Sequence, residues 1–144
     1  MSNSDQRISM AIAKRRLATV WLLGAGFLFF LLLLQTLSGV YGAKVNEAWS
    51  WLLPTFMPIL SLIVGAMVKD ARLKGIKDAT VDHFMFTLSF YLSIAYLIAV
   101  ILTLILSYLF IQVPLDQLKV SNLWLAPIQG LVCLALGAFF ISKK

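Results

Sequence analysis

The sequence predicts an all-α polytopic membrane protein with four transmembrane helices. Hydrophobic residues make up 61% of the 144 residues and charged residues only 12%, about half the share of a soluble domain. Four stretches carry no charge at all: 17–43, 48–68, 84–115 and 120–142. Each is long enough, because about 20 apolar residues cross a hydrocarbon core as a helix. Helix is the expected form, since backbone groups in lipid must be bonded within the segment and these stretches lack barrel-type alternation.

The first half of the chain is expected to contain two helices. A short basic leader, 1–16, precedes the first helix at about 17–41, whose apolar stretch is too long for a cleavable signal. The second helix is expected at about 50–68. If Pro54 takes its first position, the regular part spans only about 22 Å. That helix should then be kinked or begin below the outer surface.

The second half follows a basic loop, 69–83. The third helix is expected at about 81–110, long enough to tilt, and the fourth at about 122–141 after an N-cap at Ser121 or Asn122. We find no internal repeat in the sequence and no segment long enough for a second domain, so 1–144 is one transmembrane unit.

The basic residues predict the orientation. Of the 12 lysines and arginines, all but Lys44 and Lys119 lie before the first helix, between the second and third, or at the end of the chain. By the positive-inside rule both termini are cytoplasmic, in a bacterial-type inner membrane. The sequence pI of 9.7 therefore needs no nucleic-acid partner to explain it, and the lipid bilayer is the first expected partner.

Hydroxyl-bearing residues recur along the third helix at spacings of 4, 3, 7 and 4, and one valine completes their face. This hydroxyl stripe comprises Ser89, Ser93, Tyr96, Val100, Thr103 and Ser107. At 100° per residue the hydroxyl-bearing members fall within an arc of about 80°. Such a stripe either packs against other helices or, with Gln35 of the first helix, lines an aqueous path. One bundle of this size fills its own interior, so a pore requires a homo-oligomer.

Other faces carry small residues. The second helix has Pro54, Pro58, Ser61 and Gly65 on one side, and the fourth has Ala126, Gly130, Cys133 and Gly137. We interpret both as packing faces, because close approach of membrane helices requires small side chains.

The chemistry that is missing narrows the function. No Asp, Glu, Lys, Arg or His lies inside the predicted hydrocarbon zone, which argues against coupled transport, whereas a passive channel needs only a polar lining and a gate. No enzyme, metal or cofactor is predicted, since Asp78 and Asp82 suit the start of a helix and His83 is alone. The order Ala71-Arg72, Gly75, Asp78, Asp82 resembles the CDP-alcohol phosphotransferase signature, but its spacings cannot assemble that family's metal site.

The inner face offers a docking surface for an anionic cytoplasmic ligand, a nucleotide or an oligonucleotide, or for a partner protein. Its candidate residues are Lys14, Arg15, Arg16, Arg72, Lys74 and Lys77. Repeated around an oligomer they would clamp phosphates multivalently. The alternative is that they contact only anionic lipid.

In layout the chain resembles the small four-helix membrane channel effectors of bacterial anti-phage defence operons, of the Hailong type. The shared features are four helices, almost no soluble part, a basic inner face and no buried charge. The resemblance implies a gated channel that depolarises an infected cell on a nucleotide-derived signal. The leading hypothesis is thus an oligomeric passive ion channel or pore, and the alternative is a non-conducting accessory or assembly subunit.

Overall fold

A computed structural model describes residues 7–72, 80–110 and 114–141 of the chain. Its elements are β1 (Arg7–Ser9), α1 (Met10–Leu37), the short 3-10 helix η2 (Gly42–Lys44), α2 (Val45–Arg72), β2 (Thr80–Asp82), α3 (His83–Phe110) and α4 (Pro114–Ile141). The helices α1 to α4 are each long and apolar enough to cross a membrane. The predicted class, all-α with four membrane-spanning helices, is confirmed to that extent.

Helix α1 begins at Met10, so much of the expected leader is part of the first helix. Residues 10–16 contain neither Gly nor Pro, and Lys and Arg are good helix formers. The helix ends at Leu37, four residues earlier than predicted, in a turn where Gly39 and Gly42 have φ of 73° and 52°. Glycine adopts these positive angles without steric cost, which explains why the chain reverses here.

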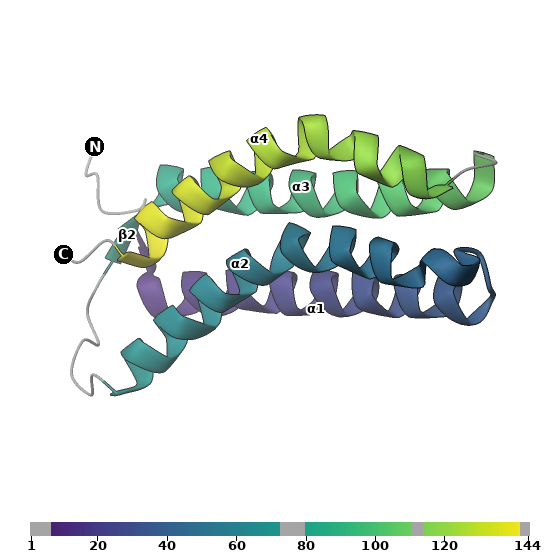
Figure 1. Cartoon of the computed structure of the whole chain (residues 1–144). Coiled ribbons are helices and arrows are strands. Elements are labelled where there is room, and N and C mark those ends of the chain that lie inside the picture. The colour runs from purple at the N-terminus through teal and green to yellow at the C-terminus, as the bar shows by residue number, and fades with distance from the viewer. Residues whose placement is uncertain (1–6, 73–79, 111–113, 142–144) are drawn as a thin grey trace.

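Helix α2 starts at Val45, about five residues before the predicted position, and contains both prolines in its interior, so Pro54 does not take the first position. Figure 1 shows α2 and α4 changing direction along their length, whereas α1 and α3 run straighter. A proline inside a helix removes one backbone bond and bends the helix, and α4 likewise contains Pro127.

Helix α4 starts at Pro114, eight residues before the predicted position. Proline suits the first helical position because its missing N–H would be unpaired there anyway. Ser121, an expected N-cap, is instead buried inside the helix, where its hydroxyl donates to the Leu118 carbonyl at 2.6 Å. Helix α3 lies within two residues of its predicted bounds.

The four helices form a bundle in which α3 packs most extensively on α4, α2 packs on α4, and α1 packs on both α2 and α3. The strands β1 and β2 pair antiparallel, with Ile8 opposite Val81, and join the starts of α1 and α3. Both halves have a 3-residue strand followed by two 28-residue helices. The second helix of each half carries Trp-Leu-x-Pro, at 51–54 and 124–127, a similarity that the search for repeats in the sequence missed.

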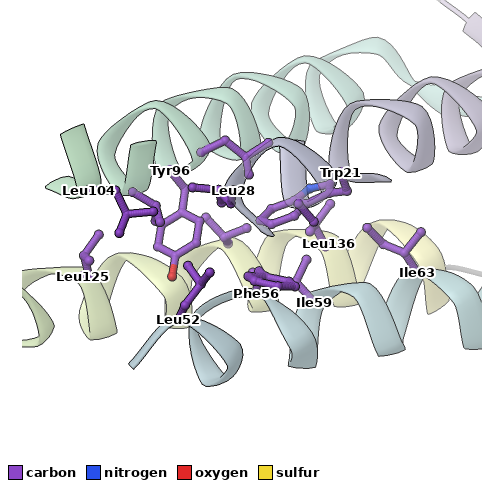
Figure 2. Packing of buried hydrophobic residues seen from close by; sticks show 14 of the residues in the cluster. Trp21, Leu28, Leu52, Phe56, Ile59, Ile63, Tyr96, Leu104, Leu125 and Leu136 are labelled. Atoms are coloured by element: carbon purple, nitrogen blue, oxygen red, sulfur yellow. The ribbon is translucent and has the colours of Figure 1, made fainter. Parts of the chain in front are cut away.

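Large side chains fill the middle of the bundle. Figure 2 shows Trp21 and Tyr96 among aliphatic residues from the four helices, and the two rings lie 6.1 Å apart between centroids. The outer surface is also apolar, with exposed residues such as Leu23, Phe27 and Leu134. A hydrophobic exterior as well as a hydrophobic interior is what a lipid environment requires.

Candidate functional site

The seven residues predicted to line a pore all lie inside one chain. Their side chains are at most 7% exposed. The set comprises Gln35, Ser89, Ser93, Tyr96, Val100, Thr103 and Ser107. Helix α3 turns this face toward its neighbours α1 and α4, so the structure brings the predicted residues together as an interior seam.

Four of the five hydroxyl groups along the stripe donate to backbone carbonyls, and the buried Ser107 hydroxyl has no partner among the described residues. Ser93 bonds the Ser89 carbonyl at 2.7 Å and Thr103 bonds the Ala99 carbonyl at 2.8 Å, each one turn back on its own helix. Such bonds satisfy a hydroxyl in an apolar environment without any other partner. Ser89 reaches across to α4, where the Ala135 carbonyl lies 3.4 Å away.

Tyr96 has the longest reach in the stripe. Its hydroxyl donates to the Thr55 carbonyl of α2 at 2.9 Å, so one side chain joins α3 to a helix that is not its main neighbour. This contact explains why a residue as large as tyrosine occupies a face otherwise made of small residues.

Gln35 lies in a second polar contact near the end of α1. Its amide nitrogen is 3.4 Å from the Leu104 carbonyl of α3, and its amide oxygen accepts a 2.7 Å bond from the Tyr41 hydroxyl. Burial raises the pKa of Tyr41 to about 12, so the phenol stays protonated and donates at ordinary pH. The glutamine therefore joins α1, α3 and the turn after α1.

The prolines of α2 create a polar site that the sequence analysis missed. Pro58 has no N–H to donate to the carbonyl of Pro54, four residues earlier. The amide nitrogen of Gln129, in α4, donates to that carbonyl at 2.8 Å. The sequence did contain a signal for this contact: two prolines four residues apart in one helix, and a glutamine within the apolar stretch of another.

The small-residue face of α2, defined as Pro54, Pro58, Ser61 and Gly65, points outward, and all four residues are exposed. A methyl group added at Gly65 would meet no neighbouring atom within 4 Å, and the same holds for Gly130 of α4. Packing within this chain therefore does not require glycine at either position.

The predicted ligand-binding residues divide into three groups. Lys14 is buried, and its ammonium lies 2.6 Å from the Asp70 carboxylate of α2 and 5.7 Å from the centroid of the Phe140 ring of α4. Its charge is thus engaged within the bundle, which corrects its assignment to a docking surface.

Arg15, Arg16 and Arg72 are exposed, as a docking surface requires. Lys74 and Lys77 lie outside the described residues. Arg15 and Arg16 line an open groove between α1 and α3, whereas Arg72 is the last residue of α2.

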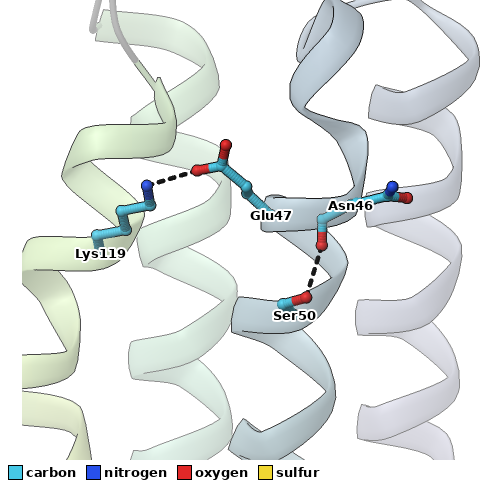
Figure 3. A network of polar contacts seen from close by, with 4 residues as sticks. All are labelled: Asn46, Glu47, Ser50 and Lys119. Carbon is cyan, nitrogen blue, oxygen red and sulfur yellow. Dashed lines mark hydrogen bonds and ion pairs between the residues drawn. The ribbon is translucent and has the colours of Figure 1, made fainter.

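An ion pair that was not predicted joins the starts of α2 and α4. The Lys119 ammonium lies 2.5 Å from the Glu47 carboxylate, with both side chains about half exposed. Figure 3 shows this pair beside the bond from the Ser50 hydroxyl to the Asn46 carbonyl, one turn along α2. An exposed pair of this kind contributes little to stability, but it shows that the starts of α2 and α4 are adjacent.

Within the described parts of the chain, no three His, Cys, Asp or Glu side chains gather as a metal site would need. His83 has Thr87 as its neighbour, with 3.3 Å between the ring nitrogen Nδ1 and the hydroxyl. The arrangement that the structure provides is a buried polar stripe inside an apolar bundle, with three exposed arginines and an exposed small-residue face on α2.

Comparison of the chain with protein-family models, curated proteins and solved structures gives no match in any of the three.

Proposed function

We propose that this chain is a non-conducting accessory or assembly subunit of a membrane complex. The observation that supports this proposal best is the burial of the hydroxyl stripe. Its Ser93 and Thr103 hydroxyls bond carbonyls of their own helix, and Tyr96 bonds α2. These polar groups of α3 are therefore bonded within one chain, and exposed residues midway along the helix, such as Ile98 and Leu102, are apolar.

The small-residue face of α2 supplies the surface for assembly. Lipid tails are as apolar as leucine, so membrane helices associate where small residues let two backbones approach closely. Gly65 has open space beyond its Cα, and Pro54 and Pro58 present no long side chain. A helix from a second copy of this chain, or from a partner protein, fits against this face.

An oligomeric passive ion channel is the second candidate, with an anionic cytoplasmic ligand as its gate and anti-phage defence as its setting. The observation that favours it is Ser61, a hydroxyl exposed midway along α2. Copies that meet through α2 would arrange Ser61 around a central axis. Arg72 would repeat at the inner end of the same helix, where a nucleotide or oligonucleotide would contact it.

Both candidates place the chain in a bacterial-type inner membrane with cytoplasmic termini. The exposed residues Arg15, Arg16 and Arg72 lie where α1 begins and α2 ends, as the positive-inside rule requires of the cytoplasmic side.

Two measurements test the proposal, one on purified protein and one in native membranes. In liposomes with a potassium gradient, we expect no flux with or without added nucleotides. In native membranes, cross-linking should give a species larger than the monomer, and Gly65→Ile should reduce it severalfold. Gly26→Ile is the matched control, because Gly26 also faces open space but belongs to α1 and not to the small-residue face of α2.

The outcomes separate the two candidates. If the wild type passes potassium and Ser61→Leu abolishes that flux, the chain is a channel and the assembly role is rejected. A monomer alone in native membranes would contradict both.

A further inference from the structure

An open groove of about 540 Å³ lies between α1 and α3 near the inner end of the bundle. It is lined by Ile12, Arg15, Arg16, Thr19, Val20 and Phe90. The five residues from α1 follow one another at helical spacings of 3, 1, 3 and 1, so they form a continuous face. Phe90 of α3 forms the opposite wall. The volume lies within the range of small-molecule sites, about 300 to 1,000 Å³.

One end of the groove is cationic. Within the parts of the chain that the structure describes, the ion pairs are Lys14–Asp70 and Lys119–Glu47, and neither involves Arg15 or Arg16. Both arginines are exposed. The neighbouring Lys14 is turned inward and paired, so the two guanidinium groups are the cations that face the groove.

The other end of the groove is apolar. Beyond Val20, the same face of α1 continues through Leu23, Phe27 and Phe30, which are 70%, 49% and 54% exposed. These residues lie deeper along the membrane-spanning helix, where hydrocarbon surrounds them. A soluble anion would contact the arginines and leave this apolar track unused, whereas a lipid would use both ends.

We propose that the groove binds one anionic phospholipid of the inner leaflet. Arg15 and Arg16 hold its phosphate through charge-assisted hydrogen bonds, and an acyl chain lies against Val20 and Phe90 before it follows the apolar track. Thr19 donates its hydroxyl proton to the Arg15 carbonyl at 2.9 Å, so the arginines supply the donors for the phosphate. Basic pockets between membrane helices on the cytoplasmic side recognise such headgroups. This site does not depend on the assembly role proposed above.

The test compares lipid retention by native mass spectrometry of the full chain in detergent, with equal amounts of phosphatidylglycerol and phosphatidylcholine. We expect the wild type to retain one phosphatidylglycerol in preference to phosphatidylcholine. In Arg15→Gln/Arg16→Gln that preference should fall roughly thirtyfold, the effect of two basic residues near a lipid phosphate. Lys69→Gln/Arg72→Gln removes the same charge from exposed positions of α2 and should leave the preference unchanged.

A second pair of variants tests the shape of the groove at constant charge. Val20→Trp fills the groove and should abolish retention, whereas Val68→Trp, at an exposed position of α2, should not. The proposal is overturned if both charge variants lose the lipid equally or if Val20→Trp retains it. It is also overturned if millimolar inorganic phosphate or a soluble nucleotide displaces the lipid from the wild type, since the groove is then a site for soluble anions.

Discussion

Two stripes of small and polar residues, one on α3 and one on α2, have opposite orientations in the fold. The hydroxyl stripe of α3 is buried, with Ser93 fully enclosed, whereas the small-residue face of α2 is exposed, Ser61 included. Both follow helical spacing and both interrupt an apolar stretch. The difference shows that periodicity establishes which residues share a face, and that it does not establish where the face points.

The largest expected difference is between two tyrosines of α3. Tyr96→Ala should lower the free energy of unfolding by about 3 kcal/mol, because it leaves a cavity beside Trp21 and removes the bond to the Thr55 carbonyl. Tyr91→Ala, at a position that is 66% exposed, should change it by less than about 0.5 kcal/mol. Reversible unfolding by SDS in mixed micelles measures both. Equal losses would mean that Tyr96 is not an interior residue.

The same substitution made in each stripe sharpens the comparison. Ser93→Leu adds volume to a filled seam and should destabilise the fold by about 2 kcal/mol. Ser61→Leu adds the same volume on an exposed face, where no side chain of the chain has to move. Its effect on the free energy of unfolding should stay below about 0.5 kcal/mol. Thermal unfolding in detergent micelles compares the pair. A Ser61 variant as unstable as the Ser93 variant would place the α2 face in a contact within the chain.

The proline bend in α2 predicts a coupled pair of substitutions. Gln129→Leu should cost about 1 kcal/mol, a typical upper range for a hydrogen bond between membrane helices, because the Pro54 carbonyl loses its donor. In a Pro58→Ala background the helix N–H is restored, so the same Gln129→Leu change should cost much less. A double-mutant cycle measures the coupling. A coupling of zero would mean that Gln129 does not compensate for the proline.

Two glycines of α1 are expected to differ in the sign of a small effect. A Cβ at Gly24 would lie 2.6 Å from a terminal methyl of Leu97, whereas Gly26 has open space. Because the Leu97 side chain can shift in part, Gly24→Ala should destabilise by only about 0.5 kcal/mol. Gly26→Ala should stabilise by a similar amount through helix propensity. Unfolding of the two variants side by side tests the contact between α1 and α3, and the same sign for both would contradict it.

Composition and charge spacing predicted the fold class and the number of helices well. Four charge-free stretches of adequate length leave few alternatives to four transmembrane helices, because a structure that spans lipid must satisfy its own backbone hydrogen bonds. The helix ends were predicted less well. Hydropathy locates the hydrocarbon core, but α1 and α4 continue beyond it through Arg15 and Lys119, where charged residues are compatible with helix.

The orientation of the stripes could not be predicted, for a physical reason. In water a polar face points outward, but in a bilayer the surroundings are as apolar as the core. A hydroxyl such as that of Ser93 can bond a carbonyl of its own helix whether its face points into the bundle or away from it. Its presence therefore does not distinguish a buried face from one that lines a water-filled pore. The contacts that decide the matter, Tyr96 with Thr55 and Gln129 with Pro54, join residues far apart in the sequence.

Nitroxide accessibility at Thr103 and Ser61 tests the central claim most directly. Each position carries a cysteine spin label in a Cys133→Ser background, in lipid bilayers, and collisions with oxygen and with a polar nickel chelate are measured. We predict few collisions of either kind at position 103, and, in the Gly65→Ile variant that does not assemble through α2, many with oxygen but few with nickel at position 61. Frequent nickel collisions at position 103 would mean that water reaches the hydroxyl stripe, which would contradict the account.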